Sequence, residues 1–147
     1  MKTPLLLAGL ALASLLPLQA DVAHDISQAA QPSKGAGSLT DGGAYARSLY
    51  NIFTQNGVEA YIVNFTWQKE TYLPAYQASF VVFRDSQGRY FGQQTNMTKA
   101  KWLSGTTPKE WAQSFYSDSF VRVDGVADNR NIVGYRPANR ASQLATQ

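Results

Sequence analysis

The chain has 147 residues, of which 44% are hydrophobic and 16% charged, with a formal net charge of +3 and no cysteine. This composition predicts a globular protein with a core of its own, and the lack of cysteine in this sequence excludes disulfides and a lipid on an N-terminal Cys. The basic residues do not form runs, so we expect no nucleic-acid partner.

The first twenty residues are typical of a secretory signal peptide. They contain one charge at Lys2, an apolar run over 5–16, and the small residue Ala20 just before an acidic stretch. The run is shorter than the ~20 residues of a membrane-spanning helix. We therefore expect cleavage after Ala20, a secreted or periplasmic location and no membrane span.

Residues 21–39 are rich in Ala, Ser, Gly and Gln, and predict a flexible leader. The stretch VAHDISQAA within it could form a short helix against the body or serve as a spacer. It carries His24, the only histidine of the chain. We expect that side chain to be exposed and without a catalytic role.

An amphipathic helix is predicted from Thr40, the N-cap, to a stop at Asn56-Gly57, with Asp41 in the first turn. Its apolar positions are spaced three and four apart and comprise Tyr45, Ala46, Leu49, Ile52 and Phe53. Gly42 and Gly43 each cost such a helix roughly 1 kcal/mol relative to Ala. Small residues there indicate either a close neighbour or a site that is left open.

Three strands follow, at 58–67, 75–84 and 89–95, the last two joined by a hairpin turn at 85–88. A capping box with Thr107, Pro108 and Glu110 then starts a short helix that ends near Phe115. Two more strands are predicted at 119–126 and 131–136, around a hairpin at 127–131.

These elements predict an α+β fold with an amphipathic N-terminal helix packed on an antiparallel sheet of about five strands, and a second short helix. We expect both helices on one face of the sheet. The single domain is expected to span 40–136, with a loose tail at 137–147.

Few residues are available for chemistry. With His24 in the leader, a nucleophile activated by histidine is not expected, and the scattered acids and single His suit no metal site. No cofactor is expected either. A hydrolase that uses carboxylates alone stays open as an alternative, with Asp41 at the helix start and Glu59 or Glu70 nearby.

From about 40 to 96, the order of elements resembles the transglutaminase-like branch of the papain-like cysteine enzymes. In that family a helix opens on a catalytic Cys, with an aromatic residue three positions on, Ala four positions on, and a Gly at the helix end. A hairpin then carries the catalytic His and Asp. Here Tyr45, Ala46 and Gly57 match, and QASFVVFRDSQGRYFGQQTN has the layout of the hairpin.

The resemblance implies that the catalytic triad is lost. Gly42 stands at the Cys position, Gln77 or Ser79 at the His position, and Gln93 or Gln94 at the Asp position. It implies a pseudoenzyme that keeps a small polar recess beside Gly42 and Gly43, where free N–H groups of the helix start could bind without reacting.

A second candidate site is the aromatic loop TWQKETYLPAY, with Trp67, Tyr72 and Tyr76. Such residues are enriched in protein-binding hot spots, although they could equally cover the core. Together the patterns predict a non-catalytic domain that binds a protein or peptide partner. An inhibitor or immunity protein against a secreted toxin is one alternative, and an envelope protein without a specific ligand is another.

Overall fold

The computed structural model describes residues 22–29, 42–95, 97 and 99–137. The expected signal peptide, Thr40, Asp41 and the tail after Pro137 lie outside the described residues. The elements are α2 (Val22–Ala29), α3 (Gly42–Gln55), β1 (Ala60–Gln68), β2 (Tyr76–Arg84), β3 (Tyr90–Gln93), β4 (Lys101–Leu103), α4 (Pro108–Phe115), β5 (Phe120–Asp128) and the 3-10 turn η2 (Asn129–Asn131). The α+β class is confirmed.

The five strands form one antiparallel sheet in the order β4-β3-β2-β1-β5. The pairing of β1 with β2 is continuous, from Ala60 opposite Phe83 to Trp67 opposite Tyr76. The pairing of β1 with β5 shifts once, because Asn64 lies opposite Gly125 while Phe65 lies opposite Val123. Asp124 is therefore the extra residue of a β-bulge.

Helix α3 buries one face, as predicted, but the residues on that face differ in part from the predicted set. Ala46, Leu49, Tyr50 and Phe53 are buried, whereas Ile52, expected in the core, is 38% exposed. The helix ends where the sequence indicates: Gly57 has a φ of 70° and the N–H of Val58 donates to the carbonyl of Phe53. This left-handed glycine turns the chain directly into β1.

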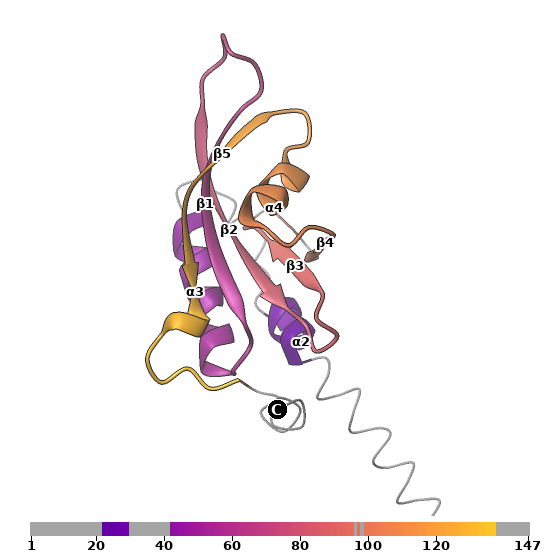
Figure 1. The fold of residues 1–147 in the computed structure, drawn as a ribbon, viewed down its shortest axis with the longest axis vertical. Helices are drawn as coiled ribbons and strands as arrows, with labels where there is room; N and C mark the ends of the chain where they lie inside the picture. Colours follow the sequence, from indigo (N-terminus) through magenta and orange to yellow (C-terminus); the bar gives the residue numbers. More distant parts are fainter. Residues whose placement is uncertain (1–21, 30–41, 96, 98, 138–147) are drawn as a thin grey trace, which may run out of the picture.

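The sheet is covered on both faces (Figure 1). One cluster of buried residues packs under α2 and α3 and comprises Ala23, Ala46, Leu49, Tyr50, Phe53, Val58, Ala60, Ile62, Val81 and Phe83. The other packs under α4 and comprises Tyr61, Val63, Phe65, Phe80, Val82, Leu103, Trp111 and Ala112. The prediction of helices on one face is therefore wrong, and the cause is visible in β1 and β2, where successive residues are apolar and side chains alternate between faces.

Two local predictions are confirmed. At the hairpin, the N–H of Gly88 donates to the carbonyl of Asp85, and the N–H of Asp85 to that of Arg89. At α4, the Thr107 side chain accepts from the N–H of Glu110, and the Glu110 carboxylate accepts in return from the N–H of Thr107.

The last third departs from the predicted strands. Residues 131–136 form no strand; β5 instead continues to Asp128 and is followed by η2. The sheet still has five strands, because β4 pairs with β3. Strand β4 is only three residues long and was not predicted. So short a strand has too few residues to show a periodic pattern.

A buried amide explains why β5 stops at Asp128. Asn129 is 0% exposed, and its side-chain oxygen accepts from the N–H of Ala60 at 2.9 Å. Its amide nitrogen donates to the carbonyl of Val58 at 2.7 Å and to the Thr54 hydroxyl at 3.2 Å. The side chain of Asn129 thus satisfies backbone groups at the corner between α3 and β1. Without it, these groups would need another partner, such as a further residue pair between β1 and β5.

Candidate functional site

At the start of α3 the structure brings together two of the residues expected there, Tyr45 and Gln93. Gln93 is at the end of β3, 0% exposed, and its amide nitrogen donates to the Tyr45 hydroxyl at 2.9 Å. Burial raises the pKa of Tyr45, and the hydrogen bond from Gln93 opposes this only in part. Tyr45 therefore stays neutral at physiological pH.

Helix α2 covers this pair. The Ser27 hydroxyl donates to the side-chain oxygen of Gln93, and the Gln93 amide nitrogen donates to the Ser27 carbonyl at 3.3 Å. Ser27 is itself buried. Helix α2 therefore occupies the place beside Gln93 where the sequence predicted a polar recess.

The other residues placed by the family resemblance lie elsewhere. Alternation along β2 puts Gln77 and Ser79 on the α3 face, with Val81. The Ser79 hydroxyl donates to the Asn64 side chain at 2.6 Å, whereas Gln77 is exposed. Gln94 lies just past β3, and its N–H donates to the sulfur of Met97 at 3.3 Å.

Gly42 and Gly43 form the first turn of α3. A methyl group added at Gly43 would contact only the tip of the Arg47 side chain, at 3.5 Å. Among the described residues, close packing therefore does not require glycine at Gly43, and the open site expected there stays a prediction.

The aromatic loop lies at the opposite end of the molecule from α2. The connection between β1 and β2 forms the upper tip of Figure 1. Tyr72 is 81% exposed and Tyr76 47% exposed. Trp67 is half-buried, with its ring stacked on Tyr116 at 4.6 Å and 5.1 Å from that of Tyr76. Trp67 therefore packs against the core, as one interpretation expected, while Tyr72 does not, and a binding role of the loop stays a prediction.

A side-chain amide holds the loop in place. The Gln68 amide nitrogen donates to the carbonyls of Thr71, at 3.2 Å, and Leu73, at 2.7 Å. The N–H of Leu73 donates back to the carbonyl of Glu70 at 3.0 Å. We call the residues Trp67, Tyr72, Leu73 and Tyr76 the aromatic tip.

The expected flexible leader is in part a docked helix, and its histidine is not free. The Nε2 atom of His24 lies 3.2 Å from a carboxylate oxygen of Asp85, and its ring meets those of Phe83 and Phe91 edge-on. Of the two sequence-based alternatives for this stretch, the helix is correct.

Asp85 is the most enclosed acid of this region, with a side chain 2% exposed. It accepts from the N–H groups of Gln87 and Arg89, and the Arg89 guanidinium lies 2.8 Å away. Burial alone would raise the pKa of Asp85, but the hydrogen bonds from Arg89 and His24 outweigh it and lower that pKa. Ser27 is the serine nearest to His24 on this helix, and its hydroxyl donates a hydrogen bond to Gln93 rather than to His24. These residues therefore do not form a Ser-His-Asp relay.

Two of the three carboxylates named for the hydrolase alternative, Glu59 and Glu70, are far apart from each other. Glu59 and Glu70 flank opposite ends of the nine-residue β1, and a strand of that length spans ~30 Å. A catalytic pair needs a separation of about 5 to 9 Å. Glu59 and Glu70 could not act together as such a pair. The hydrolase alternative combines Asp41 with one of them, and because Asp41 lies outside the described residues, that alternative stays a prediction.

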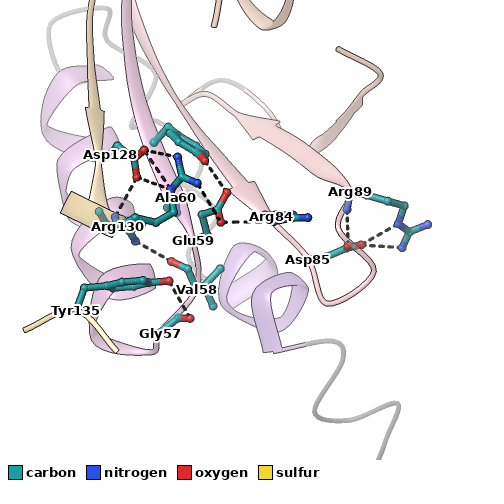
Figure 2. A network of polar contacts seen from close by, with 12 residues as sticks. Gly57, Val58, Glu59, Ala60, Arg84, Asp85, Arg89, Asp128, Arg130 and Tyr135 are labelled. Carbon is teal, nitrogen blue, oxygen red and sulfur yellow. Dashed lines mark hydrogen bonds and ion pairs between the residues drawn. The ribbon is translucent and has the colours of Figure 1, made fainter. Parts of the chain in front are cut away.

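Glu59 belongs to an ionic network instead (Figure 2). Its carboxylate lies 3.6 Å from Arg84 and 4.0 Å from Arg130, and accepts from the Tyr61 hydroxyl at 2.5 Å. Arg130 also pairs with Asp128 at 2.7 Å. Burial and the neighbouring Glu59 raise the pKa of Tyr61. These contacts fasten η2 to the lower end of the sheet.

Tyr135 completes this attachment, because its hydroxyl donates to the carbonyl of Gly57 at 3.1 Å. Burial raises its pKa to about 12, so the donor proton is retained at neutral pH.

In the parts of the chain that the structure describes, no three His, Asp or Glu side chains are grouped as a metal site would require. No helix in the same parts has the length and apolar character needed to cross a membrane. Comparisons with protein-family models, curated proteins and solved structures find no match to this chain.

Proposed function

We propose that this chain is a secreted or periplasmic binding domain without catalytic activity, and that it recognises a protein or peptide partner through the aromatic tip. The proposal includes the transglutaminase-like layout, in which Gly42 stands at the position of the catalytic Cys. The observation that carries it is the exposure of Tyr72 and Tyr76 at the end of a projecting hairpin.

Aromatic side chains supply much of the binding energy at protein interfaces, because they bury a large area at little entropic cost. Tyr72 exposes 81% of its surface. A side chain this exposed contributes little to the core, whereas it could be buried against the surface of a partner.

Contacts within the chain also hold the tip in the conformation that it would present to a partner. Gln68 fixes the loop backbone, and the stacked rings of Trp67 and Tyr116 support Tyr76 from below. A preorganised surface loses less conformational entropy on binding than a mobile loop.

The test replaces Tyr72 by a photo-crosslinking amino acid in the full chain, expressed in cells of the source organism. We expect a discrete adduct after irradiation, and its loss when Tyr76→Ala is added. Ser86, in the exposed β2–β3 turn, is the matched control position and should give no adduct.

Equal crosslinking from 72 and 86, or none from either, would contradict the proposed surface. The identity of the adduct separates the remaining alternatives, since a toxin would indicate an inhibitor or immunity protein and an envelope component an accessory role. Peptidase or transglutaminase turnover above blank by the purified protein would contradict the non-catalytic part of the proposal.

A further inference from the structure

Helix α2 docks through its small side chains. Ala23 and Ser27, four residues apart and hence on one side of the helix, are 4% and 3% exposed. Val22 and Ile26 flank them and are partly buried. The surface beneath comprises Tyr45, Phe83, Asp85, Phe91 and Gln93, and we call it the α2 seat.

Polar contacts position α2 on this seat at two separate points. At one, Gln93 exchanges two hydrogen bonds with Ser27, one to the hydroxyl and one to the carbonyl. At the other, His24 meets the Asp85 carboxylate and the edges of two Phe rings. The seat therefore contacts a hydroxyl and an imidazole that lie three residues apart on one helix.

The larger apolar side chains of α2, Val22 and Ile26, are only partly buried, and its buried side chains are the small Ala23 and Ser27. An eight-residue helix is unstable on its own in water, so α2 is helical because it is docked. Burying an Ala and a Ser side chain gives less stabilisation than burying a Leu or Phe, because the free energy scales with apolar area. The docking thus combines defined polar contacts with apolar contacts in which no large side chain of α2 is completely buried.

We propose that the α2 seat is a binding site for a short amphipathic helix, and that α2 fills it in cis as a displaceable occupant. The ligand class is a helix with two small residues four positions apart, the second a Ser or Thr that reaches Gln93, and a His or other hydrogen-bond donor that reaches Asp85. This site is at the other end of the sheet from the aromatic tip, so it does not depend on the function proposed above (Figure 1).

The first test measures whether α2 leaves its seat while the core stays folded. Because the chain has no cysteine, Ser27→Cys and Ala46→Cys each introduce one buried thiol, the second in α3. If α2 opens locally, the thiol of the Ser27→Cys variant should react with a thiol reagent at least about tenfold faster than that of the Ala46→Cys variant under native conditions. Equal rates would show that α2 leaves only on global unfolding, and would overturn the proposal. Ala23→Cys repeats the measurement with the Ser27–Gln93 contact intact.

The second test measures the seat itself. A fluorescent peptide of residues 21–30 is titrated into full-length Ser27→Arg, in which the cis helix cannot dock. We expect saturable binding to this variant and none to the unmodified protein, where the tethered helix competes at an effective concentration on the order of 1 mM. The same peptide carrying Ser27→Arg should not bind.

Failure of the peptide to bind a Ser27→Arg protein with native near-ultraviolet circular dichroism would overturn the proposal, as would equal binding to both proteins. If Ser27→Arg does not fold, the thiol measurement decides alone.

Discussion

Asn129 shows how a single side chain can replace a piece of secondary structure. It satisfies the N–H of Ala60 and the carbonyl of Val58, two backbone groups of the buried α3–β1 corner. A buried backbone group without a partner costs free energy, so the amide is required there rather than merely tolerated.

We therefore expect Asn129→Ala to lower the free energy of unfolding by about 2 to 4 kcal/mol, because two buried groups lose their partner. Urea denaturation monitored by tryptophan fluorescence would measure it. Asn131→Ala, at an exposed position of the same turn, is the control and should change stability by less than about 0.5 kcal/mol. If the two variants are equally stable, water must be able to reach the corner and replace the amide.

At the scale of elements, the sequence predicted α3, α4 and the first three strands because each has its own local signal. These signals are the 3.6-residue period of α3, the capping box of α4, and the β-branched and aromatic runs of the strands. Strand β4 has no such signal, and the end of β5 is decided by Asn129 contacting residues about seventy positions earlier.

The candidate site was predicted only in part for the same reason. Tyr45 and either Gln93 or Gln94 were among the residues expected at the site, and Tyr45 and Gln93 are in contact. The third partner, Ser27, comes from a stretch whose composition resembles a linker, and a helix of eight residues there depends on contacts with the rest of the chain. The small residues Ala23 and Ser27, four positions apart, were the one available signal.

The packing of β3 against α4 depends on a glycine. A methyl group at Gly92 would lie 2.7 Å from the ring of Phe115 and 3.1 Å from Leu103. Phe115 cannot move away freely, because its ring packs against Phe80 at 4.7 Å. We expect Gly92→Ala to destabilise the protein by about 1 to 3 kcal/mol through overpacking.

Thermal unfolding would measure this loss, and the double variant Gly92→Ala/Phe115→Leu should recover part of it. Gly125→Ala in β5 is the matched control, because an added methyl group there meets nothing within 4 Å. Additive effects of the two substitutions in the double variant would rule out the proposed clash.

At the scale of the whole molecule, the helices are staggered. Helices α2 and α3 cover one face at the lower end of the sheet, and α4 covers the other face (Figure 1). The upper part of the α3 face consequently carries polar residues such as Asn64, Thr66 and Gln77. The two proposed binding regions therefore lie at opposite ends and can be altered separately.

The charges of the whole molecule also predict how it responds to acid. Among the residues that the structure describes, hydrogen bonds in the folded state lower the pKa values of the carboxyl groups of Asp85, Glu110, Asp124 and Asp128. A carboxyl group with a lower pKa when folded binds fewer protons in that state, so it contributes stability above its unfolded pKa of about 4 and loses it as the pH falls. We expect the free energy of unfolding to decrease steadily below about pH 5.

Asp85→Asn tests the buried member of this set. It should lower stability at pH 7 and make the decrease between about pH 5 and pH 3 shallower, because the titrating group is gone. Asp118→Asn, at an exposed position, should follow the unmodified protein. Parallel acid profiles for Asp85→Asn and the unmodified protein would show that the His24 and Arg89 contacts do not persist in solution.

The bulge at Asp124 also bears on solubility. β5 is an edge of the sheet within the described residues, and a straight strand of nine residues would offer a template on which other chains could add as further strands. The extra residue breaks the regular spacing of free backbone groups, and Arg122 and Asp124 add charge beside the break. We expect removal of Asp124 to straighten that edge and to favour edge-to-edge pairing of β5 between copies at high protein concentration.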